Sequence, residues 1–121
     1  MKSVSLSASK DFELETAYKY IEDLAAFIEV PEDGVLSRTV YADEQVKAVI
    51  FGFDTGQELS EHTASMPAIV HIIKGQARLT LGGESFEAGE GAWVHMTAGL
   101  RHSIHAITPV VMLLLLLKMP K

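Results

Sequence analysis

The chain has 121 residues, of which 48% are apolar and 21% are charged, and this balance is typical of one globular domain with one hydrophobic core. The net charge is −6 and no cluster of Lys or Arg occurs, so we expect no nucleic-acid partner. The absence of cysteine excludes disulfides and thiolate metal sites, which leaves five histidines and the carboxylates as the good metal ligands.

Both ends of the chain bear on where the protein resides. Residues 1–10 are rich in serine and lack the apolar core of a signal peptide, and the lack of cysteine fits a reducing compartment, so we expect a cytoplasmic protein. The apolar run from Val110 to Leu117 is far shorter than the ~20 residues that cross a bilayer as a helix. It predicts a buried strand, with a membrane anchor as the alternative, and we expect no membrane partner.

The N-terminal segment has the apolar spacing of one helical face. Apolar residues recur at spacings of four and three, which predicts an α-helix through positions Leu14, Tyr18, Ile21, Ala25 and Ile28. Pro31 and Gly34 end the predicted helix. We therefore expect residues 1–33 to form an N-terminal segment with a helix, and residues 34–118 to form a single β-barrel domain.

After Gly34 the sequence changes to short β-branched and aromatic runs separated by turn residues, as in a sandwich or barrel. The Gly82–Gly83 pair predicts a tight two-residue hairpin, because glycine supplies the positive φ angles of such turns. The predicted strands are Val35 to Tyr41, Gln45 to Asp54, Ala68 to Lys74, Gln76 to Leu81, Glu84 to Ala88, Ala92 to Met96, His102 to Ile107 and Val110 to Leu117.

Two stretches of this β-rich part match motif spacings of the cupin superfamily. The first motif has a glycine, a histidine and a closing glycine in place at Gly56, His62 and Gly75, and the second has matches at Gly91, Gly99 and His102. The chain therefore resembles the small single-domain, RmlC-like cupins of bacteria (cupin type-2 domain) over residues 34–117. The resemblance implies an all-β cupin jelly-roll barrel, a double-stranded β-helix, here with one N-terminal α-helix.

The departures from these motifs concern metal binding. In the family, three histidines and a glutamate hold one divalent transition metal such as Fe, Mn, Ni or Zn. Here Ala64, Ala68 and Ala106 stand where the family has the second His, the Glu and a later Asn. The resemblance thus leaves only His62 and His102 as metal ligands, whereas catalytic sites use about three protein ligands.

The other three histidines are candidates for a missing ligand. Side chains alternate along a strand, so we expect His71 and His105 to face away from the pocket. The turn from Thr97 to Arg101 breaks the register between His95 and His102, so His95 is the leading candidate for a third ligand. A partly exposed strand histidine is the equally weighted alternative for His95.

The same register suggests a ligand pocket. Its expected residues, each with a plain core or surface role as the alternative, are His62, His102, His95, Met66, Trp93, Met96 and Arg101. Further apolar residues expected to line or floor the cavity are Phe51, Phe53, Val70 and Ile72. Arg101 lies on a turn at the barrel mouth, where a guanidinium can pair with a carboxylate-bearing ligand.

Three functional hypotheses follow. The preferred one is a small-molecule-binding cupin of unassigned specificity with a partly degenerate metal site, because Ala64 and Ala68 enlarge the cavity. The alternative is a metal-dependent cupin enzyme, a dioxygenase, decarboxylase or isomerase acting on a small organic substrate. The third is an assembly role, in which the N-terminal helix and the apolar last strand form the interface of a homodimer.

Overall fold

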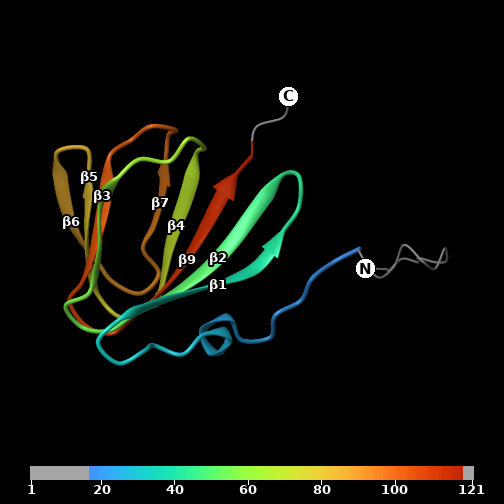
Figure 1. Cartoon of the computed structure of the whole chain (residues 1–121), viewed down its shortest axis with the longest axis horizontal. Coiled ribbons are helices and arrows are strands. Elements are labelled where there is room, and N and C mark those ends of the chain that lie inside the picture. The colour runs from blue at the N-terminus through green and yellow to red at the C-terminus, as the bar shows by residue number, and fades with distance from the viewer. Residues whose placement is uncertain (1–16, 119–121) are drawn as a thin grey trace.

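The computed structural model of the protein describes residues 17–118, which form two facing antiparallel sheets (Figure 1). The larger, five-stranded sheet has the order β1-β2-β9-β4-β7, and the smaller, four-stranded sheet has the order β3-β8-β5-β6. The strands within this range are β1 (Val35–Ala42), β2 (Val46–Phe53), β3 (Glu58–His62), β4 (Ala68–Lys74), β5 (Ala77–Leu81), β6 (Glu84–Ala88), β7 (Trp93–Met96), β8 (His102–Ala106) and β9 (Val110–Leu117). The expected all-β jelly roll is confirmed.

The main core lies between the two sheets, because alternate side chains of each strand point inward. On β4 the inward set is buried and the intervening residues are half-buried. The largest fully buried side chains of this core are Phe53, Ile72 and Val110, and residues from both sheets pack around them. The two sheets therefore share one interior, and any site between them is lined from both sides.

The apolar run at the C-terminal end is the central strand of the larger sheet. β9 pairs with β2 over its full length on one side, and with β4 from Val111 to Leu116 on the other. Its inward residues pack in the core between the sheets, and Val111 and Leu113 on the outer face pack with the N-terminal segment, which accounts for most of the apolar residues of this strand. Among residues 17–118, no helix is long and apolar enough to span a bilayer.

Most predicted strands agree with the structure within a residue or two, but β3 was missed. Its sequence, Glu58–His62, contains two glutamates and a serine and carries none of the β-branched residues that usually indicate a strand. It forms because its backbone pairs with β8. The strand is thus dictated by its partner rather than by local preference.

The expected N-terminal α-helix is not present in the described part of the segment. Residues 17–23 are not helical, and the only helical turn there is a four-residue 3-10 turn, η1 (Leu24–Phe27); Leu14 lies outside the described residues. Leu24, Phe27, Ile28 and Val30 instead pack on the outer face of the larger sheet, in a cluster with Ile50 and Val111, whereas Tyr18 is 81% exposed. Contact with the sheet buries them without a regular helix, and a short helix has little intrinsic stability.

The predicted hairpin is present between β5 and β6. Leu81 and Glu84 are the last paired residues, so Gly82 and Gly83 alone form the loop. Only Gly82 has a positive φ, of 63°, rather than both glycines as expected. A positive φ at the first loop position is what a type II′ turn requires.

Candidate functional site

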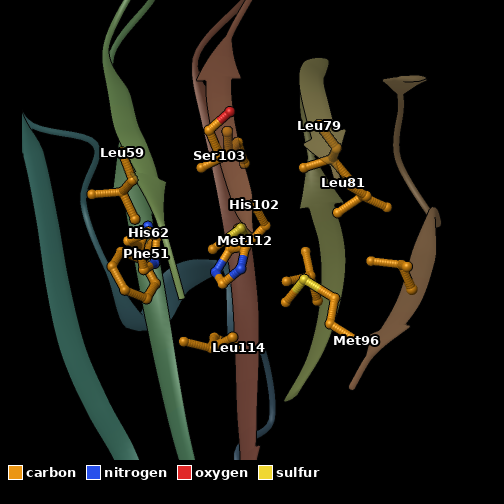
Figure 2. Close-up of a pocket in the computed structure, with 13 residues that line it drawn as sticks. Phe51, Leu59, His62, Leu79, Leu81, Met96, His102, Ser103, Met112 and Leu114 are labelled. Atoms are coloured by element: carbon orange, nitrogen blue, oxygen red, sulfur yellow. The ribbon is translucent and has the colours of Figure 1, made fainter. Parts of the chain in front are cut away.

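A cavity of about 80 Å³ lies between the sheets, and Figure 2 shows the side chains around it. Both sheets contribute to its wall, which is mainly apolar. Its lining residues are Phe51, Leu59, His62, Val70, Leu79, Leu81, Val94, Met96, His102, Ser103, Ile104, Met112 and Leu114. The two histidines supply the titratable groups of this wall.

His62 and His102 face each other across neighbouring strands. They are Cα partners in the β3–β8 ladder, and their ring centroids lie 4.2 Å apart with a tilt of 60°. Leu59 also lines the cavity, although His62 lies three positions after it, and strand alternation alone would put the two side chains on opposite faces. The ladder shifts register between these two residues, and this bulge turns His62 back to the inner side.

Hydrogen bonds to backbone carbonyls orient both rings. His62 Nδ1 lies 2.8 Å from the oxygen of Ser60, and His102 Nδ1 lies 2.9 Å from the oxygen of Leu100. A carbonyl oxygen can only accept, so Nδ1 carries the hydrogen in each ring. The other nitrogen of a neutral imidazole, Nε2, then holds a lone pair. The site therefore presents two oriented lone-pair donors beside an apolar cavity.

The family assignment follows from this fold and from the sequence comparison. The family model described as the cupin domain matches residues 49–116, which contain both histidines. The chain belongs to the cupin family. A conserved protein of unknown function from Streptococcus pyogenes is 30% identical, with a TM-score of 0.77 over 86% of this chain and 91% of that one. No curated protein matches the sequence.

Two more distant structures share the fold alone. A cupin superfamily protein from Desulfitobacterium hafniense is 24% identical, with a TM-score of 0.77 over 84% of this chain and 95% of that one. KdgF from a Halomonas species is 19% identical, with a TM-score of 0.71 over 86% of this chain and 96% of that one. These likenesses establish the jelly roll of this cupin and leave its ligand to be argued from the site.

The donor set of this cupin does not fit the divalent metal centre that the family motifs imply. In the part of the chain that the structure describes, no group of three or more His, Cys, Asp or Glu side chains could hold a metal ion. The cavity wall contains no carboxylate. Ala68, at the position of the family's glutamate, is buried on β4 and brings only a methyl group. Two imidazoles fall short of the roughly three protein ligands of a catalytic site.

Three of the seven expected pocket residues line the cavity, namely His62, His102 and Met96. His95 does not reach it: its neighbours Val94 and Met96 face inward, so alternation along β7 turns His95 outward, and it is exposed. Trp93 is turned away for the same reason and is 60% exposed. The expected role of His95 as a third ligand is therefore wrong.

The remaining expected residues lie elsewhere. Arg101 and Met66 are absent from the cavity wall; the former is exposed on the turn before β8, and the latter is half-buried in the β3–β4 connection. His71 pairs with Trp93 and lies on the outer face of the larger sheet, in line with strand alternation. His105 is also outside the cavity, where its Nδ1 lies 3.2 Å from a carboxylate oxygen of Glu58.

Of the apolar lining candidates, Phe51 and Val70 line the cavity, whereas Phe53 and Ile72 are fully buried core. Sequence reasoning missed most of the wall, including Met112 and Leu114 on β9. A strand in which every residue is apolar has no alternation from which its inner face can be recognised. On β8, by contrast, the spacing of two from His102 could have identified Ile104 as an inward residue.

Proposed function

We propose that this cupin binds a small molecule whose apolar part enters the cavity and whose hydroxyl group donates a hydrogen bond to the histidine pair. The observation that carries the proposal is the combination of an apolar cavity with two oriented imidazoles at its wall. A concave apolar site with few, well-placed polar groups is the usual form of a small-molecule site.

The size of the cavity limits what enters it. An apolar cavity of roughly 150 Å³ can hold a benzene molecule, and this cavity has about 80 Å³. It therefore accepts a few non-hydrogen atoms, such as a short alkyl group. His62 is exposed whereas His102 is half-buried, so the pair connects the interior with solvent, where a larger ligand would extend.

The chemistry of the histidine pair favours a donor. Since Nδ1 of each ring donates to a carbonyl, Nε2 accepts. A hydroxyl group satisfies that acceptor, whereas a charged group would lose its hydration in an apolar cavity without a counter-charge. Alcohols and other hydroxyl compounds are thus the ligand class that the wall supports best.

A metal-dependent enzyme of the cupin type has weaker support. Such a dioxygenase, decarboxylase or isomerase needs a held metal and an open coordination position. The wall provides two imidazoles and no carboxylate, and His95 points outward. Binding without catalysis therefore accounts for more of the site.

Matched ligands test the proposal. 1-Butanol and 1-fluorobutane have similar size and shape, but only the alcohol donates a hydrogen bond. Binding can be followed by NMR from the shifts of methyl-labelled Met96 and Met112, which line the cavity. We expect the alcohol to bind more tightly by about 1 kcal/mol, or roughly fivefold, the typical contribution of one hydrogen bond.

Two variants separate the loss of the hydrogen bond to the histidine pair from the effect of replacing a histidine elsewhere on the protein. The double variant His62→Phe, His102→Phe keeps rings of similar shape and removes both Nε2 acceptors, so the preference for the alcohol should disappear. His71→Phe makes the same replacement on the outer face of the larger sheet and should keep the preference. The proposal fails if neither compound gives saturable shifts at the cavity methyls, or if the variant that lacks both histidines discriminates like the unmodified protein.

A further inference from the structure

Within residues 17–118 the two sheets end in four edge strands, and two of these edges are regular. Register shifts interrupt the other two, between Thr39 and Tyr41 on β1 and between Leu59 and His62 on β3. The edges β6 and β7 pair with their neighbours without a shift, and β6 lies at the outer end of the smaller sheet (Figure 1). A bulge disrupts the row of unpaired backbone groups that an edge offers to another chain. The edges β6 and β7 therefore keep this row intact.

An apolar groove of about 260 Å³ lies between these two regular edges. Residues of β5, β6 and β7 form most of its wall, and Glu87 is the charged residue there. Phe86 is the Cα partner of the buried Leu79, so it lies on the inner face of the smaller sheet, beside the groove. Phe86 and Trp93 are 47% and 60% exposed, so two large aromatic side chains of this groove are uncovered. Since a cavity of roughly 150 Å³ holds benzene, the groove accepts one large apolar side chain.

The hairpin between β5 and β6 determines which backbone groups of β6 are free. Leu81 and Glu84 close its two-residue loop, and such a closing pair exchanges both backbone hydrogen bonds. Successive residues of a strand direct their N–H and C=O groups to opposite edges, so Ser85 and Glu87 direct theirs away from β5. Ser85, Phe86 and Glu87 are all exposed. The free edge of β6 therefore presents two residues with both hydrogen-bonding groups available, and Phe86 lies between them on the groove side.

The charge of this edge favours one kind of partner. Glu84 and Glu87 lie on β6, and neither β6 nor β7 carries a lysine or an arginine. Arg78 is the Cα partner of Glu87, yet the two form no ion pair among the residues that the structure describes. Like charges on paired strands are destabilising, so the β6 edge of a second copy is a poor partner. Opposite charges on paired strands are stabilising, which favours a basic segment.

We infer that the free edge of β6 binds an extended, basic peptide segment of a partner protein, which adds an antiparallel strand to the smaller sheet. An apolar side chain of the segment lies opposite Phe86 and fills the groove, and a basic side chain lies opposite Glu87 on the other face. In such strand addition, backbone hydrogen bonds provide affinity and pockets for alternate side chains provide specificity. This function does not depend on hydroxyl-ligand binding at the histidine pair, although the groove and the cavity share Leu79, Leu81 and Val94 in their walls.

Synthetic peptides test the inference on the full chain by calorimetric titration. The basic peptide is acetyl-Lys-Val-Lys-Phe-Lys-Val-Lys-amide, and we expect it to bind with a Kd below about 1 mM. A peptide with glutamate in place of each lysine should bind at least roughly fivefold more weakly. In an added antiparallel strand, the lysine opposite Glu87 directs its backbone groups toward β6. Methylation of the lysine backbone nitrogens should therefore abolish binding, whereas methylation of the valine and phenylalanine nitrogens should preserve it.

Amide exchange and a charge reversal locate the bound peptide. The basic peptide should slow hydrogen exchange at the amides of Ser85 and Glu87, while the amides of β1 keep their rates. Glu87→Lys should weaken the basic peptide roughly fivefold and strengthen the glutamate peptide. Glu44→Lys makes the same change of net charge in the exposed connection between β1 and β2, away from the groove, and should leave both affinities as they are.

The outcomes distinguish this edge from the small-molecule site. The inference is overturned if the basic peptide gives no saturable binding, if the two methylated peptides bind equally well, or if Glu87→Lys binds both charged peptides like the unmodified protein. Protection of the β1 amides instead of Ser85 and Glu87 would also overturn it. The double variant His62→Phe, His102→Phe should bind the basic peptide like the unmodified protein, so loss of alcohol preference and loss of peptide binding are measured separately.

Discussion

Gly75 is the glycine whose replacement by a larger residue should destabilise the fold most, because a side chain there would collide with the backbone. It follows β4, has a φ of 88°, and a Cβ built there would lie 2.0 Å from the carbonyl oxygen of Pro109. Gly56 provides a matched control, since its φ of 82° is similar but a Cβ there would meet nothing within 4 Å. Comparing alanine at the two positions separates backbone conformation from steric contact.

The conformational part is common to both substitutions. The left-handed conformation destabilises a residue that has a Cβ by about 1–2 kcal/mol. Alanine also makes the unfolded chain less flexible, which stabilises the folded state by about 0.4–1 kcal/mol. We therefore expect Gly56→Ala to lower the free energy of unfolding by about 1 kcal/mol.

The steric part applies to Gly75→Ala alone. Pro109 must retreat from 2.0 Å to at least 3.4 Å for ordinary contact, and the obstacle is backbone rather than a flexible side-chain end. Such overpacking costs about 1–3 kcal/mol. The shift also strains the 2.9 Å hydrogen bond from the Gln76 amide to Thr108 Oγ1, which is worth about 1 kcal/mol. The total loss should be about 3–5 kcal/mol, taking these terms with the conformational cost.

Urea unfolding at a fixed protein concentration checks these values. Both variants should keep the slope of the unfolding free energy with urea. The difference between their urea midpoints, multiplied by that slope, should equal the steric part of the free energy. A loss for Gly75→Ala within about 0.5 kcal/mol of that for Gly56→Ala, the spread of ordinary surface substitutions, would refute the reasoning. That result would mean that the connection before β9 yields easily.

Three other features lead to measurable consequences. Hydrogen bonds from the amides of Asp33 and Thr55 hold the pKa of the Asp54 carboxyl below its ordinary value of 3.8, so this stabilisation is present above pH 3.8 and is lost as pH falls through the lowered pKa. Urea midpoints of the protein and of Asp54→Asn should therefore converge at acid pH, and a constant gap would contradict this. Arg38 donates a 2.7 Å hydrogen bond to the Phe27 carbonyl and lies 4.0 Å over that ring, so Arg38→Met should speed amide exchange in residues 24–30, while unchanged exchange would argue against this clamp. Light scattering should give twice the chain mass, because the outer face of the larger sheet carries half-buried leucines; a monomer at high concentration would refute the dimer.

The histidine pair was predictable because motif spacing encodes a fixed backbone path. Gly56 to His62 and Gly99 to His102 keep the separations of the family, and the structure makes the two histidines Cα partners. The composition and turn residues likewise predicted an all-β domain, since glycine at positive φ and β-branched runs act locally.

The wrong expectations share a cause, which is that local patterns lack information about partners. The apolar spacing of residues 14–28 predicted a helix, but in the described part of that segment the apolar residues from Leu24 onward pack against the outer face of the larger sheet without forming an α-helix, and Tyr18 is exposed. The strand β3 was missed because its pairing with β8, rather than its composition, forms it. Tertiary contacts routinely outweigh such weak local preferences.

By itself, the sequence determined the jelly roll, the strands flanked by turns and the two histidines that meet, because these depend on spacing and on backbone conformations that only certain residues adopt. Only the tertiary structure decided what surrounds the pair. The bulge in β3 turns His62 inward, the alternation along β7 turns His95 outward, and the pairing of β9 with two strands selects Met112 and Leu114 from an unbroken apolar run. Each of these depends on which face of a strand meets the opposite sheet, and that choice is made when the sheets pack together.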